Sequence, residues 1–185
     1  SLTLQENTTD DNTAVGYNTL CATTTGIQNT AVGSLALDSN TTASNNTGIG
    51  YSALTANLTG TRNVALGAFS LQLATTASDN TAIGFGSLST NVTGTRNVAV
   101  GSLTLQENTT NDNTAIGYNT LCANTTGTRN TAMGSSALNS NTTTSDNTAI
   151  GYNSLSASLL GSRNTALGSS TLTTAISASD NTAIG

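Results

Sequence analysis

The chain has 185 residues, of which 7% are charged and 3% aromatic, and it contains no Pro, Trp or His. Its net charge of -5 offers no cluster of cations to nucleic acid. Without His and Lys, the usual general bases and imidazole metal ligands are missing, and no run is apolar enough to cross a bilayer. We therefore expect neither an enzyme, nor a nucleic-acid-binding protein, nor a membrane-inserted segment.

One short motif recurs along the whole chain: Asn, then Thr or Val, a small residue, an apolar residue and Gly. The step between motifs is 17 residues, except for 16 between the sixth and the seventh. We number each module from its Asn, which is position 1. The fixed period predicts a solenoid, with residues 1–185 as one repeat domain and a fragment of a longer repetitive chain or filament subunit. The Asn residues are Asn12, Asn29, Asn46, Asn63, Asn80, Asn97, Asn113, Asn130, Asn147, Asn164 and Asn181.

Within each module, apolar residues fall at positions 4 and 9 in short runs bounded by Gly, Asn, Ser and Thr. These runs, together with regular Gly and many β-branched Thr, indicate strands rather than a helix. We predict a strand at positions 1 to 4, a bend at the position-5 Gly, a second strand at about positions 6 to 10, and a turn that closes the coil. The predicted fold class is all-β: a β-solenoid or parallel β-roll of about eleven coils, each of about 17 residues.

The columns at positions 4 and 9 are expected to form a continuous apolar spine inside the coils. Alternation along the first strand then puts the position-3 Ala on the opposite face. The predicted spine consists of Val15, Leu20, Val32, Leu37, Ile49, Leu54, Leu66, Leu71, Ile83, Leu88, Val100, Leu105, Ile116, Leu121, Met133, Leu138, Ile150, Leu155, Leu167 and Leu172.

The residue before each Asn, at position 17, alternates between acid and Arg over most of the chain. Neighbouring coils should place these side chains one above another, where unlike charges attract and like charges repel. This charge ladder is therefore expected to favour the correct pairing of coils. Its charged members are Asp11, Arg62, Asp79, Arg96, Asp112, Arg129, Asp146, Arg163 and Asp180.

Asn-x-Ser/Thr sequences gather at or near position 12, in the closing turn. Two explanations stay open: Asn suits a turn that needs positive φ, or the rod is secreted and carries N-linked glycans along one edge. The candidate glycosylation sites are Asn7, Asn40, Asn57, Asn91, Asn108, Asn124 and Asn141.

No cofactor is expected, with one alternative. The oxygen-rich turns at Asp10–Asp11 and at Asn111–Asp112 carry the ligand type that calcium prefers.

Thr occupies position 2 in nine of the eleven modules, and Val64 and Val98 replace it in the other two. A regular Thr array would match ice or a crystalline polysaccharide. Alternation places this Thr on the same side as the predicted position-4 spine, which would bury part of it.

The stretches Asn63–Gly67 and Asn97–Gly101 resemble the head repeats of trimeric autotransporter adhesins, the YadA-like head, which centre on a similar Ser/Asn-Val-Ala-Ile-Gly motif. The resemblance implies a left-handed parallel β-roll, three chains packed side by side, and a role in surface attachment. It also implies an interior place for Val64, Leu66, Val98 and Val100, and a sharp bend at Gly67 and Gly101.

Together these features predict a structural or adhesive rod of an extracellular fibre, adhesin or filament, located outside the cell, at a cell surface or in a virion fibre. Its expected partners are copies of itself, as a trimer or a head-to-tail filament, and a surface glycan or host ligand. The alternative is a binding module whose regular polar face recognises ice, glycan or mineral.

Overall fold

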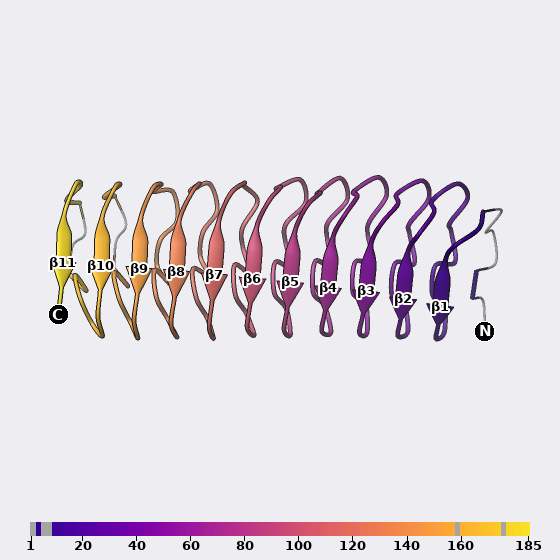
Figure 1. Ribbon diagram of the computed structural model, residues 1–185, viewed down its shortest axis with the longest axis horizontal. Helices are drawn as coiled ribbons and strands as arrows, with labels where there is room; N and C mark the ends of the chain where they lie inside the picture. The colour runs from indigo at the N-terminus through magenta and orange to yellow at the C-terminus, as the bar shows by residue number, and fades with distance from the viewer. Residues whose placement is uncertain (1–2, 5–8, 158–159, 175–176) are drawn as a thin grey trace.

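The computed structural model describes residues 3–4, 9–157, 160–174 and 177–185. These residues form eleven strands of three residues each, all parallel and in a single sheet whose spatial order follows the chain (Figure 1). The predicted fold class is confirmed: the protein is an all-β solenoid of roughly ten turns with about 17 residues between strands. The strands are β1 (Thr13–Val15), β2 (Thr30–Val32), β3 (Thr47–Ile49), β4 (Val64–Leu66), β5 (Thr81–Ile83), β6 (Val98–Val100), β7 (Thr114–Ile116), β8 (Thr131–Met133), β9 (Thr148–Ile150), β10 (Thr165–Leu167) and β11 (Thr182–Ile184).

Every strand pairs in register with the strands one coil before and one coil after it. Position 2 faces position 2, position 3 faces position 3, and position 4 faces position 4, as in the pairing of Val98 with Thr114. This pair spans the one module that is a residue short, so its closing turn absorbs the deletion. The sheet therefore stays continuous over all eleven strands.

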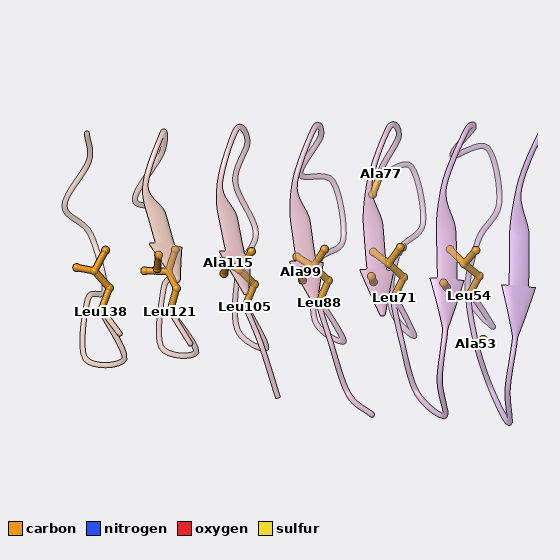
Figure 2. Close-up of a cluster of buried hydrophobic side chains, with 14 of the residues drawn as sticks. Ala53, Leu54, Leu71, Ala77, Leu88, Ala99, Leu105, Ala115, Leu121 and Leu138 are labelled. Carbon is orange, nitrogen blue, oxygen red and sulfur yellow. The ribbon is translucent and has the colours of Figure 1, made fainter. Parts of the chain in front are cut away.

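Most of the apolar core is made by the position-3 Ala column and the position-9 Leu column, which face each other across the coil (Figure 2). Buried Ala residues at other positions complete it: Ala36, Ala53, Ala74, Ala77 and Ala137. A Cβ placed on Gly48, the single Gly at position 3, would lie 3.4 Å from Cγ of Leu37. The methyl group of Ala at this position thus fills the space that the Leu side chain leaves. The fully buried Leu residues are Leu20, Leu37, Leu54, Leu71, Leu88, Leu105, Leu121, Leu138 and Leu155, and Leu172 packs against the same cluster.

The predicted spine is therefore right at position 9 and wrong at position 4. Because alternate residues of a strand point to opposite faces, burial of the position-3 Ala turns positions 2 and 4 outward. The interior implied for Val64 and Leu66 is wrong for the same reason, since both side chains are exposed. At position 4, Val15, Leu66, Ile116, Met133, Ile150, Leu167 and Ile184 are exposed, and Val32, Ile49, Ile83 and Val100 are partly exposed.

The second predicted strand, at positions 6 to 10, is a series of turns. Each position-9 Leu has a φ between 47° and 52°, in the left-handed region, and position 7 is left-handed as well, as at Asn119 (φ 54). A left-handed backbone costs a residue with a Cβ about 1–2 kcal/mol, whereas full burial of a Leu side chain contributes about 1.5–3 kcal/mol. Burial of the side chain outweighs the backbone strain, so Leu occupies a conformation that usually favours Gly.

The interior also contains two columns of buried Asn. At position 1, the Oδ1 atom of each Asn accepts a hydrogen bond from the backbone N–H of the Asn one coil later; the distance from N of Asn97 to Oδ1 of Asn80 is 2.9 Å. The Nδ2 group of Asn80 donates to the carbonyl oxygen of Gly94, at 2.8 Å. This position-1 asparagine ladder joins coil to coil from Asn12 to Asn181.

Candidate functional site

Among the described residues no pocket opens, and no group of three His, Cys, Asp or Glu side chains comes together as a metal site would require. That part of the chain also has no helix of the length and apolar character needed to cross a membrane. The candidate sites are therefore the columns of side chains that run along the outside of the rod.

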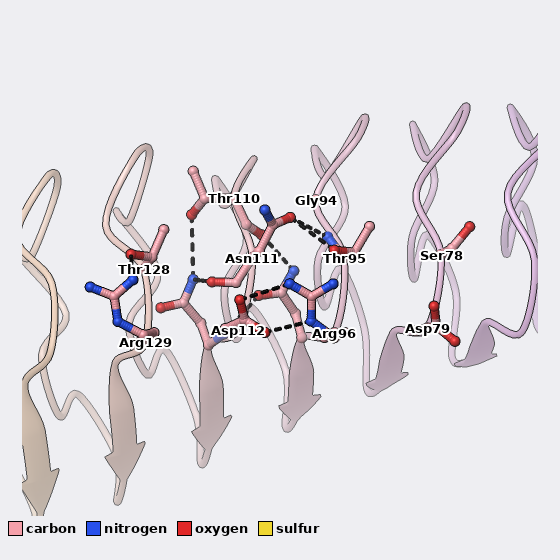
Figure 3. Close-up of polar contacts among 12 residues, drawn as sticks. Ser78, Asp79, Gly94, Thr95, Arg96, Thr110, Asn111, Asp112, Thr128 and Arg129 are labelled. Carbon is pink, nitrogen blue, oxygen red and sulfur yellow. Dashed lines mark hydrogen bonds and ion pairs between the residues drawn. The ribbon is translucent and has the colours of Figure 1, made fainter.

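The charge ladder at position 17 forms bidentate ion pairs between neighbouring coils. Figure 3 shows Arg96 beside Asp112, with Nε 2.7 Å from Oδ1 and Nη2 2.9 Å from Oδ2. Three further pairs repeat this arrangement: Arg62–Asp79, Arg129–Asp146 and Arg163–Asp180. Position 17 in the two coils that follow Asp11 is Gln28 and then Asn45, so the continuous charged run begins at Arg62.

The ion pairs are exposed to solvent, and each of them lowers the pKa of its Asp side chain. Hydrogen bonds from Arg129 hold the pKa of Asp146 below its ordinary value, and the charges of Arg129 and Arg163 add to this effect. The pKa values of Asp79, Asp112 and Asp180 are lowered for the same reason, each first by the hydrogen bonds of its own Arg. Each Arg–Asp ion pair joins two neighbouring coils, so the charged surface repeats every two coils rather than every coil.

The position-12 Asn residues are buried and hydrogen-bonded instead of forming an exposed row of glycan acceptors. Side-chain bonds between coils join Asn40 to Asn57, Asn108 to Asn124 and Asn124 to Asn141. The Nδ2 group of Asn141 donates to Oδ1 of Asn124 at 2.9 Å and to the carbonyl oxygen of Thr144 at 3.1 Å. A glycan on Nδ2 would replace one of the two hydrogens that make these bonds and has no room, because the side chain is fully buried. The prediction of glycosylation is therefore wrong at Asn40, Asn57, Asn91, Asn108, Asn124 and Asn141, which are all fully buried, and Asn7 lies outside the described residues.

The turn proposed as a calcium site, Asn111–Asp112, already uses its oxygen atoms. Oδ1 of Asn111 accepts from the backbone N of Thr95 at 2.7 Å, and both carboxylate oxygens of Asp112 accept from Arg96 (Figure 3). A calcium ion here would have to displace these donors.

The outer face of the sheet carries two parallel columns, the Thr or Val at position 2 and the apolar residue at position 4. Thr13, Thr165 and Thr182 are exposed, and the other Thr residues of the column are partly exposed. The sheet thus presents polar and apolar rows side by side, repeated at the strand spacing of about 4.8 Å.

The sequence did not predict two features of the structure, because a single sequence gives only indirect signals for them. The position-1 Asn marks the repeat, but nothing in its spacing says that its side chain is buried and bridges coils. At position 6, aromatic and small residues alternate, and the structure places the aromatic side chains of Tyr17, Tyr51, Phe85, Tyr118 and Tyr152 on the exposed surface.

Comparison of the chain with protein-family models, curated proteins and solved structures found no match. The side-chain columns on the surface of the rod are therefore the guide to its function.

Proposed function

We propose that this chain is a structural rod of an extracellular fibre, adhesin or filament, and that it associates side by side with copies of itself. The observation that carries the proposal is the outward apolar column at position 4. This column runs the length of the sheet, and Leu66, one of its members, is 44% exposed. A contiguous exposed apolar surface of this kind marks an interaction site, and a regular column is complementary to the same column on a second rod.

Three further features support a structural role. The resemblance to trimeric autotransporter head repeats suggests three chains packed side by side at a cell surface. Long in-register pairing and the position-1 asparagine ladder make a stiff element without a pocket among the described residues. Repeated identical surfaces also allow many weak contacts to add up along the rod.

Sedimentation velocity over a range of protein concentrations tests self-association. We expect assemblies for the unchanged chain and a monomer for a variant with Leu66→Thr, Ile116→Thr and Ile150→Thr, since Thr suits a strand. The matched control replaces Leu58 and Val92, which are exposed in the closing turns, by Thr and should assemble normally. An unchanged chain that stays monomeric at every concentration would overturn the proposal.

A second candidate function is recognition of ice or a mineral surface by the position-2 Thr column. It is favoured by one observation: the column faces outward, because burial of the position-3 Ala turns it away from the core. Thr131→Lys would place a long charged side chain in the middle of this array and leave the core intact. Thermal hysteresis in the unchanged chain and its loss in this variant would support the candidate, and no hysteresis in the unchanged chain would dismiss the ice version.

A further inference from the structure

The position-6 residues Tyr17, Tyr51, Phe85, Tyr118 and Tyr152, here called the aromatic row, are between 49% and 62% exposed. Each is two coils from the next. Two strand spacings make this interval roughly 10 Å. Removal of a large aromatic side chain from water is favourable. A row of exposed rings at a constant interval is therefore a suitable surface for a ligand with the same repeat.

Backbone pairing between coils fixes the positions of these rings. The carbonyl oxygen of each aromatic residue accepts a hydrogen bond from the position-7 N–H of the following coil. The distance is 2.9 Å from N of Leu35 to O of Tyr17 and 3.0 Å from N of Ser136 to O of Tyr118. Because the bond recurs along the row, the interval is set by the solenoid rather than by flexible loops, and a long ligand would meet a preformed site.

One part of the row is reinforced by a third ring. Phe69, at position 7 of the intervening coil, makes an edge-to-face contact with Tyr51 at a centroid distance of 5.3 Å and another with Phe85 at 5.7 Å. The interplanar angles are 84° and 88°. Edge-to-face packing is a favoured arrangement of aromatic rings. Phe69 therefore acts as a positioning residue that contacts two members of the row and restricts the orientation of their rings.

The charge around the row indicates the kind of ligand. No charged residue occupies positions 1 to 9 of any module, so every residue of the row lies in an uncharged segment. The Arg and Asp pairs lie at position 17, in a different part of each coil. Tyr118 and Tyr152 of the row are followed directly by Asn119 and Asn153, whose amide groups suit hydroxyl partners. The matching ligand is uncharged, rich in hydroxyl groups and apolar on one face.

We propose that the aromatic row binds an extended, uncharged β-1,4-linked polysaccharide chain that lies along the rod. In such a chain successive sugars are turned by half a turn, so every second sugar presents the same apolar C–H face. That disaccharide repeat has the length of two strand spacings, roughly 10 Å, and each exposed ring would pack against one such face. Five sites in a line bind far more tightly than one, because the later contacts form within the same complex.

The row is separate from the position-2 Thr column, and the inference does not depend on self-association of the rod. If copies of the chain cover the row instead, removal of the rings would change the oligomeric state and leave polysaccharide binding absent. The two outcomes can be measured on the same protein samples.

Co-sedimentation with insoluble cellulose and chitin, and fluorescence titration with cellohexaose, provide the test. We expect the unchanged chain to bind both polymers, and a Tyr51→Ala, Phe85→Ala, Tyr118→Ala variant to bind cellohexaose at least about tenfold more weakly. Phe69→Leu should weaken binding less, because it removes only the support. Circular dichroism checks that the variants fold, and Leu58→Ala with Val92→Ala is the matched surface control.

Amylose, whose α-1,4 linkages make a curved chain, is the geometric control and should not be retained. The proposal is overturned if the unchanged chain fails to bind cellulose and chitin, if the aromatic variant binds as well as the unchanged chain, or if amylose binds equally. Loss of assembly in the aromatic variant without any sugar binding would also overturn it, and would assign the row to contacts between rods.

Discussion

Nε of Arg129 lies 2.7 Å from Oδ1 of Asp146 in the next coil, and Nη2 of the same guanidinium lies 2.8 Å from Oδ2. The pair is exposed to solvent, so its contribution to stability is small. Its geometry nevertheless depends on one alignment: a shift of the sheet by one coil would place Arg against Arg and Asp against Asp. The ladder thus distinguishes neighbouring coils whose strands are nearly identical.

The charge ladder makes the stability of the fold depend on pH in the acidic range. Arg129 lowers the pKa of Asp146 in the folded chain, so the unfolded chain takes up the proton first as the pH falls. The stabilisation is complete above the ordinary aspartate pKa of about 3.9 and is lost as the pH falls through the lower folded-state value. We expect the thermal midpoint to fall between about pH 5 and pH 2.

The control for the pH prediction is a variant in which Arg62, Arg96, Arg129 and Arg163 are replaced by Gln. Its aspartates should regain ordinary pKa values, so its midpoint should vary less over the same acidic range. Identical pH profiles for the two proteins would show that the ladder does not cause the dependence.

The two apolar columns should respond differently to truncation. Leu121 is fully buried at position 9, whereas Ile116, in the same coil, is exposed at position 4. Leu121→Ala should lower the free energy of unfolding by about 2–5 kcal/mol, because it leaves a cavity. Ile116→Ala should lower it by less than about 1 kcal/mol. Urea denaturation of the monomeric chain measures both, and equal losses would contradict the assignment of the core.

The contrast between these two columns shows which part of the core the sequence predicts. The 17-residue period and short apolar runs are enough to predict parallel coils, and the position-9 Leu is correctly placed inside. Position 4 is equally apolar, so hydropathy cannot tell that the neighbouring Ala is the inward residue. The deciding factor is the narrow interior, where the Leu side chain leaves room for a methyl group only, as the 3.4 Å approach at Gly48 indicates.

The candidate surfaces were predicted to different degrees. The charge ladder follows from position 17 alone, because stacked coils bring equal positions together. The prediction of a glycan row is wrong because an Asn-x-Thr sequence is the same whether the Asn amide faces solvent or another Asn. Asn124 illustrates the second case, since its Nδ2 donates to Oδ1 of Asn108 and to the carbonyl oxygen of Gly127.

The position-1 asparagine ladder should be costly to interrupt. Nδ2 of Asn130 donates to the carbonyl oxygen of Thr144 at 2.8 Å, and its Oδ1 accepts from the backbone N of Asn147 at 3.0 Å. Asn130→Ala leaves the buried backbone N–H of Asn147 without a hydrogen bond, and an unsatisfied group of this kind costs about 1–3 kcal/mol. The carbonyl oxygen of Thr144 loses one of its two donors and keeps Nδ2 of Asn141. We expect a loss of about 1–3 kcal/mol in the free energy of unfolding.

The matched control is Asn139→Ala in the same coil. Asn139 is only partly buried, and its side chain accepts one bond, from Oγ of Ser140 at 3.3 Å. Its replacement should change the free energy of unfolding by no more than about 0.5 kcal/mol. If both variants unfold at the same urea concentration, the buried ladder does not contribute as proposed.

Two glycines in one coil should give opposite results when each is replaced by Ala. Gly48 occupies position 3, where most coils have Ala, and a Cβ there would make ordinary contacts of 3.4 Å or more. Gly50 occupies the bend with a φ of +134°, and a Cβ there would lie 2.6 Å from the carbonyl carbon and oxygen of Gly67. Gly48→Ala should therefore stabilise the chain by about 0.4–1 kcal/mol, since it restricts the unfolded state and fills the core.

Gly50→Ala should destabilise the chain, because the backbone conformation is strained for any residue with a Cβ and the contact is with backbone that cannot move aside. Thermal or urea denaturation of the two single variants, measured at a concentration where assembly is absent, compares them directly. The same sign of change in both would mean that the inward place of position 3 or the bend at position 5 is misassigned. Opposite signs two residues apart are expected only when one Gly merely lacks a methyl group and the other is required by the path of the chain.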